Sequence, residues 1–204
     1  MTIISDMLKT KMPLWSQTSK AVIAPVAPFA GRIIDFSDRT LRFALKTGPL
    51  KPYEAFLPGF SFGFEKDALI VLRLAKAEDG APALFCEIEA RMSRWLTLEI
   101  ALDHEMLKRT RAAFAMIEAA AAPRIAIKTG LRIPQRKAEE GFVDSSPFSF
   151  VLDSAIGNTT FSFPVLQSDI EPFEGIREAK LILFMPLKNF SVCLRRLSIA
   201  PTGL

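Results

Sequence analysis

The chain has 204 residues, half of them hydrophobic, and its mean hydropathy of +0.24 is high for a protein that does not sit in a membrane. No run approaches the roughly 18 to 20 unbroken apolar residues of a membrane-spanning helix, so no transmembrane segment is expected. The formal net charge is +4, with 26 basic and 22 acidic residues mixed along the chain, which excludes a charged arm for a nucleic acid polymer. The apolar excess must enter a core, an oligomer interface or an exposed binding face.

Residues 1–28 are predicted to be an N-terminal segment or linker, followed by a single domain over residues 29–204. The stretch KAVIAPVAPFAG, in which two prolines break the apolar run, is a poor secretory signal. Two cysteines, Cys86 and Cys193, are too few for a disulfide framework and are expected to be buried free thiols. These features favour the cytoplasm.

Short segments rich in Ile, Val, Phe and Leu then follow one another, bounded by Gly, Pro, Asn or Asp. Their number and spacing predict an all-β fold, an antiparallel sandwich or barrel. Each expected strand has one apolar and one polar face, which favours a two-sheet antiparallel β-sandwich. The expected strands are residues 31–37, 40–45, 60–65, 68–75, 84–92, 96–102, 124–133, 148–153, 159–166, 179–187 and 190–199.

Alternation along these strands predicts which side chains face the core. In residues 124–133, Ile125 and Ile127 point one way, and Lys128 and Arg132 point the other. In the last strand the alternation slips by one residue at Arg195–Arg196, which predicts a β-bulge.

One capping α-helix is expected over an open end of the sandwich. Asp103 would be its N-cap, and Pro123 would end it. Its apolar stripe would consist of Leu107, Phe114, Ile117 and Ala121.

The stretch LFCEIEARMSRWLTLEIALD, residues 84–103, is predicted to form a hairpin whose polar face pairs Glu89 with Glu99. Opposed carboxylates could act as acid and base in sugar hydrolysis, but no enclosing pocket is indicated and Arg91 adjoins Glu99, so no catalytic residue is predicted. The candidate ligand-binding residues are Glu89, Arg91, Trp95 and Glu99. A solvated strand face is the other interpretation.

Other chemistry finds little support in the sequence. His104, the single histidine, has no ligand partners at zinc spacing, and no glycine-rich phosphate loop occurs. The loop DSAIGN, residues 153–158, is interpreted as a turn and not as a calcium site. We therefore predict neither a metal nor a cofactor.

The strand layout of residues 30–200, which closes with AKLILFMPLKNFSVCLRRLSI, resembles the jelly-roll domains used as carbohydrate-binding modules. This resemblance implies a sandwich of jelly-roll type and non-catalytic binding of a glycan or polysaccharide. Glu89, Arg91 and Glu99 would hydrogen-bond the sugar, and Trp95 would stack on it, with Tyr53 and Trp15 as further aromatic residues. Docking to a partner protein, or self-association into a homo-oligomer that light scattering would detect, is the other function that the apolar content favours.

The segment GRIIDFSDRTLRF, residues 31–43, resembles the D-x-S-x-x-G motif of the PilZ family, β-barrels that bind cyclic di-GMP. Asp35 and Ser37 match, and Thr40 stands at the Gly position. An Arg-x-x-x-Arg pair, Arg132 and Arg136, follows this motif instead of preceding it. The resemblance implies a nucleotide or anion site made of these residues, or a regulatory relative that has lost the nucleotide and acts through protein contacts.

Overall fold

The computed structural model describes residues 32–36, 45–77, 80–90, 93–102, 107, 111–134, 142–144, 148–164 and 179–202; the segment predicted over 1–28 lies outside them. No helix among these residues is long and apolar enough to cross a membrane. The described residues form strands β1 (Arg32–Asp35), β2 (Gly48–Pro49), β3 (Ala55–Leu57), β4 (Phe60–Phe64), β5 (Leu69–Lys76), β6 (Pro82–Glu89), β7 (Leu96–Leu102), β8 (Ala112–Ala122), β9 (Ile125–Pro134), β10 (Phe142–Asp144), β11 (Phe148–Leu152), β12 (Gly157–Pro164), β13 (Ala179–Phe184) and β14 (Phe190–Thr202).

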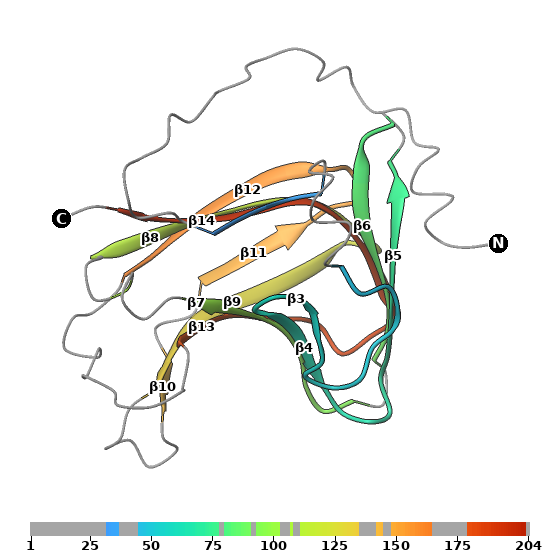
Figure 1. The fold of residues 1–204 in the computed structure, drawn as a ribbon, viewed down its shortest axis with the longest axis horizontal. Coiled ribbons are helices and arrows are strands. Elements are labelled where there is room, and N and C mark those ends of the chain that lie inside the picture. The colour runs from blue at the N-terminus through green and yellow to red at the C-terminus, as the bar shows by residue number, and fades with distance from the viewer. Residues whose placement is uncertain are drawn as a thin grey trace.

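These strands form two seven-stranded sheets packed face to face (Figure 1). Sheet A has the order β12-β8-β14-β6-β5-β2, with β1 also paired to β14. Sheet B has the order β10-β9-β13-β7-β4-β3, with β11 also paired to β9. Every pairing is antiparallel. The predicted antiparallel β-sandwich of jelly-roll type is therefore confirmed.

The core lies between the sheets and follows the predicted alternation. On β9, Ile125 and Ile127 are buried, whereas Lys128 is exposed. Along β14, the register shifts between Leu194 and Arg196, so the predicted bulge is confirmed.

Both cysteines are buried and free, as predicted. Cys86 belongs to the main core, and Cys193 packs in a small second cluster with Ala83 and Phe85. Burial raises the pKa of the Cys86 thiol far above its usual range. This side chain therefore behaves as a small apolar group.

The capping helix predicted from Asp103 to Pro123 is wrong over most of its length. Residues 112–122 form β8, which pairs with β12 on one side and with β14 on the other. In residues 103–110 the structure describes only Leu107, whose side chain is buried.

Alanine explains why this strand has the composition of a helix. Ala113, Ala115 and Ile117 are buried on β8, while Phe114 between them is 46% exposed. Phe114 and Ile117 would share one stripe on a helix, but on this strand they point to opposite faces. Alanine has a high helix propensity, but pairing with a strand on each side and burial of the small alanine side chains against the core favour the strand more.

The predicted hairpin of residues 84–102 is also wrong, because β6 and β7 belong to different sheets. Glu89 lies opposite Leu69 of β5, whereas Glu99 lies between Ser61 of β4 and Ile182 of β13. The apolar faces of β6 and β7 were identified correctly, but they cover one core from opposite sides. The connection after Glu89 therefore crosses from sheet A to sheet B.

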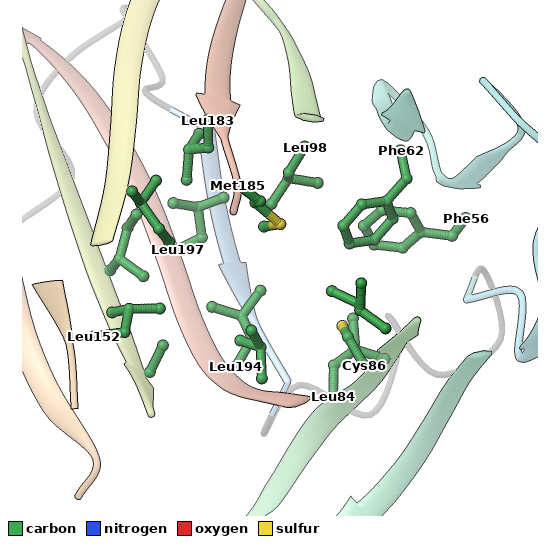
Figure 2. Close-up of a pocket in the computed structure, with 15 residues that line it drawn as sticks. Phe56, Phe62, Leu84, Cys86, Leu98, Leu152, Leu183, Met185, Leu194 and Leu197 are labelled. Carbon is green, nitrogen blue, oxygen red and sulfur yellow. The ribbon is translucent and has the colours of Figure 1, made fainter. Parts of the chain in front are cut away.

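A small apolar cavity remains between the sheets. Its volume is about 30 Å³, and Phe62, Cys86, Met185 and Leu194 point into it (Figure 2). Such a space could hold one water molecule by size, but its apolar lining offers no hydrogen-bond partner. The cavity therefore marks loose packing where the small side chains of β8 face the core.

Filling this cavity should stabilise the fold. Ala119 of β8 is buried and lines the cavity, so Ala119→Val should raise the free energy of unfolding by about 1 kcal/mol. Ala115 is buried on the same strand away from the cavity, and Ala115→Val should lower stability through overpacking. Urea denaturation of both variants measures the difference, and equal effects would contradict the assignment.

Candidate functional site

The outward side of sheet B carries the polar residues that the sequence placed opposite the core. We call it the outer face of sheet B. In Figure 1, β10 on one side and β4 on the other turn downward from β9, β13 and β7, away from β8, β12 and β14 of sheet A, so the outer face lies on the hollow side of this bend. One row of side chains crosses the strands from Gly63 through Thr97 and Phe184 to Lys128.

Tyr53 reaches this face from a tight turn beside β4. The turn is closed by a 3.0 Å hydrogen bond from the Glu54 N–H to the Lys51 carbonyl, with Pro52 at its second position. Tyr53 occupies the third position with a φ of 59°, a left-handed conformation that usually selects glycine. Its N–H donates to the Phe62 carbonyl at 2.7 Å, which fixes the turn against β4.

Trp95 enters the same face from the connection between β6 and β7. The Glu65 carboxylate fastens this connection, because it accepts bonds from the Arg94 N–H at 2.6 Å and the Arg94 Nε at 2.9 Å. These bonds lower the pKa of Glu65. The Ser93 hydroxyl donates to the Trp95 carbonyl at 2.6 Å, so the backbone on both sides of the indole is held.

The two aromatic rings meet over β4. The centroids of Tyr53 and Trp95 are 5.5 Å apart with an interplanar angle of 30°, an offset stacked arrangement. Gly63 permits this approach: a Cβ at that position would lie 2.9 Å from Trp95 Cζ3 and 2.5 Å from Thr97 Oγ1. The glycine thus leaves the space into which the indole packs.

An ion pair with a buried acidic partner lies beside the aromatic pair. Glu99 is only 7% exposed, and its carboxylate accepts from Lys180 Nζ at 2.7 Å and from Thr97 Oγ1 at 3.1 Å. Burial, together with the charge of Glu99, raises the pKa of Tyr53, while Lys180 and Arg132 oppose that increase. The Tyr53 phenol is therefore within electrostatic reach of all three charged groups.

The far side of the face is cationic. The Arg132 guanidinium lies 3.8 Å from the centroid of the Phe142 ring, and Asp144 is its register partner on β10. Lys128 is exposed at the end of the row that begins at Gly63. The face thus combines an aromatic platform, a buried ion pair and an exposed ammonium group.

The structure brings together some of the predicted ligand-binding residues and separates others. Trp95 and Glu99 share the outer face of sheet B. Glu89 is exposed in sheet A and is not part of this face. Arg91 lies outside the described residues, as does Trp15.

The residues of the PilZ resemblance are not gathered into one site. Asp35 belongs to β1 of sheet A, opposite Arg196, whereas Arg132 belongs to β9 of sheet B. Ser37 and Arg136 lie outside the described residues. The chain is a two-sheet sandwich, so the single barrel that this resemblance implied is not its fold.

Sequence reasoning missed Gly63 and Lys180. An isolated glycine inside a strand, as in FSFGF, often marks a close approach of another group, so Gly63 did leave a signal. No sequence signal pointed to Lys180, because it lies 81 residues from Glu99, the carboxylate that it pairs with. Within the described ranges, no cluster of three or more His, Cys, Asp or Glu side chains could hold a metal ion.

No protein-family model matches the chain, and no curated protein matches it either. Among solved structures, it is similar to the N-terminal cellulose-binding domain of Cellulomonas fimi β-1,4-glucanase C, with 10% identity, 76% of this chain and 99% of that chain covered, and a TM-score of 0.48. It is also similar to the CBM22-2 xylan-binding domain from Paenibacillus barcinonensis Xyn10C, with 12% identity, coverages of 69% and 91%, and a TM-score of 0.48. A third is the family 11 carbohydrate-binding module from Clostridium thermocellum, with 13% identity, coverages of 79% and 99%, and a TM-score of 0.41. A function for the outer face must therefore be argued from this chain's own residues.

Adding one methyl group at Gly63 should disturb the aromatic platform. Gly63→Ala forces Trp95, Thr97 or Glu99 to move, so we expect a loss of about 1 to 3 kcal/mol in stability and a shift in Trp95 fluorescence, read in a Trp15→Phe background. Gly157→Ala is the matched control, because its Cβ would meet no atom within 4 Å. An unchanged emission spectrum for Gly63→Ala would contradict the packing described above.

The single tyrosine of the chain allows the electrostatics to be titrated directly. The negative charge of Glu99 disfavours the phenolate, so Glu99→Gln should lower the pKa of Tyr53, measured from tyrosinate absorbance against pH. Glu118→Gln removes a carboxylate from β8 of sheet A and should leave the curve in place. A titration that is identical for wild type and Glu99→Gln would show that the two groups are not coupled.

Proposed function

We propose that this chain is a non-catalytic glycan-binding module and that the outer face of sheet B binds the sugar chain. The observation that carries the proposal is the stacked pair of Tyr53 and Trp95, in which the indole packs against Gly63 beside an ion pair. Tyr53 is 56% exposed, so its ring is open to a ligand. A sugar ring has apolar C–H faces and a rim of hydroxyl groups, and this surface offers both kinds of contact.

The polar part of the face suits hydroxyl groups in particular. Glu99 supplies an acceptor, Lys180 supplies a donor, and the Tyr53 phenol can serve as either. Because Glu99 and Lys180 are already paired, binding a neutral hydroxyl does not require either charge to be newly buried without a partner. The polar groups of this face are therefore preorganised for binding a polyhydroxylated ligand.

The same geometry argues against sugar hydrolysis by the predicted carboxylates. That chemistry requires two carboxyl groups on either side of one glycosidic bond. Glu89 and Glu99 lie in different sheets, and Glu99 is engaged by Lys180. Binding without chemistry is the function that this arrangement supports.

Docking to a partner protein is supported less well. The core of a protein interface is usually depleted of charged residues, whereas here charged and hydroxyl groups lie beside the aromatic pair. A homo-oligomer and a cytoplasmic location stay predictions of the sequence.

Removing the aromatic platform should remove binding. On an oligosaccharide array, followed by calorimetry with the best ligand, we expect Trp95→Ala to weaken affinity at least about tenfold. Tyr53→Gly should also weaken it while preserving the turn, because glycine accepts the left-handed conformation.

Phe114→Ala is the matched control, since it truncates a 46% exposed aromatic side chain on sheet A. That variant should bind like the wild type. An array on which the folded wild-type chain binds no oligosaccharide, or unchanged affinity in Trp95→Ala, would refute the proposal.

A further inference from the structure

Positive side chains outnumber carboxylates on the central strands of the outer face of sheet B. On β4, β7, β13 and β9, this face carries the cations Lys128, Lys180 and Arg132 and the carboxylate of Glu99. Two of the three cations have a contact within the fold, which leaves Lys128 to be explained.

Lys180 and Arg132 are accounted for by their neighbours. Lys180 holds the Glu99 carboxylate at 2.7 Å. Arg132 lies over the ring of Phe142 and opposite Asp144. Each of these two cations therefore has a contact within the fold.

Lys128 is different, because uncharged residues surround it on this face. Its register partners are Phe184 on β13 and Ser149 on β11. The next positions on the same face of β9 are Ala126 and Gly130. In the part of the chain that the structure describes, none of these adjoining positions carries an acid, and the Lys128 side chain is exposed.

Two more cations lie near the start of β9. Lys188 Nζ donates to the Arg124 carbonyl at 3.3 Å, so the two residues are neighbours. Asp153 follows the register partner of Ile125, and its carboxylate accepts from the Ser154 N–H at 2.8 Å. Among the described residues near the start of β9, the three basic side chains of Arg124, Lys128 and Lys188 thus outnumber this carboxylate.

Lys128 is also placed to meet a ligand that lies on the aromatic platform. The row Gly63, Thr97, Phe184 and Lys128 crosses four adjacent strands. Three strand spacings amount to roughly 14 Å. A sugar chain that stacks on Trp95 over Gly63 and runs across the strands passes Phe184, which is 37% exposed, before it reaches Lys128.

Resting on the proposed function, we infer that the glycan bound by this face is acidic and that Lys128 binds its carboxylate. The ligand class is a uronic-acid-containing oligosaccharide, with the uronate about three strand spacings from the residue that stacks on Trp95. An exposed ammonium group forms charge-assisted hydrogen bonds to a carboxylate that a neutral sugar cannot supply. A sulfate ester shares the negative charge and is distinguished in the experiment below.

The experiment compares an acidic oligosaccharide with its carboxyl-reduced form, in which each uronate has become a neutral hexose of the same linkage. The array carries uronate-containing, sulfated and neutral oligosaccharides, and calorimetry follows at two NaCl concentrations. We expect the acidic form to bind about tenfold more tightly than the reduced form, with affinity falling as salt rises. Lys128→Gln should abolish that preference, Lys128→Arg should keep most of it, and Lys76→Gln on β5 of sheet A should leave it intact.

Equal affinity for the acidic and reduced forms, or an unchanged preference in Lys128→Gln, would overturn the inference and leave the glycan-binding proposal standing if Trp95→Ala still abolishes binding. Binding of sulfated but not uronate-containing ligands would overturn the carboxylate assignment. A blank array would refute both proposals together.

Discussion

The ion pair of Glu99 and Lys180 is the interaction on which the outer face of sheet B depends. A carboxylate that is only 7% exposed loses most of its hydration, and it is tolerated because Lys180 and the Thr97 hydroxyl replace water. Removing one partner would leave the other charge close to the aromatic platform without compensation. Gly63 leaves space for both the Glu99 carboxylate and the indole, and the charge of Glu99 raises the pKa of Tyr53. The polar row of β7 is therefore a buried, ordered surface and not a solvated strand face.

Period-two alternation was enough to predict the sandwich, because it depends on which side chains must leave water. The strands around Ile125, Leu98 and Val192 were all recognised in this way, and so was the bulge at Arg195–Arg196. Alternation fails where alanine fills much of a strand, as in β8, since alanine looks the same in a helix and in a strand. It also cannot tell which sheet a strand joins. Strands that follow each other in the sequence usually pair, but β6 and β7 lie in different sheets on either side of the core. Glu89 therefore lies in sheet A and Glu99 in sheet B.

Two residues of the candidate site, Trp95 and Glu99, could be proposed from the sequence because the pattern around them is local. Trp95 and Glu99 are close in the chain, and their residue types suggest stacking and hydrogen bonding by themselves. Lys180 becomes part of the site only through the pairing of β13 with β7, a long-range contact that no local pattern encodes. Tyr53 was noticed as an aromatic residue, but its role depends on a left-handed turn that sequence preferences would assign to glycine. Residues whose local conformation runs against their propensity are the ones that sequence reasoning places worst, and they gather at sites.

That conflict at Tyr53 is itself an argument for binding. A left-handed conformation costs a residue with a side chain roughly 1 kcal/mol or more, which glycine would avoid. The fold meets this cost through the hydrogen bond from Tyr53 to the Phe62 carbonyl and through the Lys46–Glu54 ion pair beside the turn. Stability alone would favour glycine here, yet the ring is 56% exposed, so its packing recovers only part of what the backbone loses. What the tyrosine adds is a second aromatic ring stacked with Trp95 at an interplanar angle of 30°, ordered before any ligand binds. A ligand that stacks on this pair does not have to immobilise it, and binding is stronger by the ordering cost already met in folding.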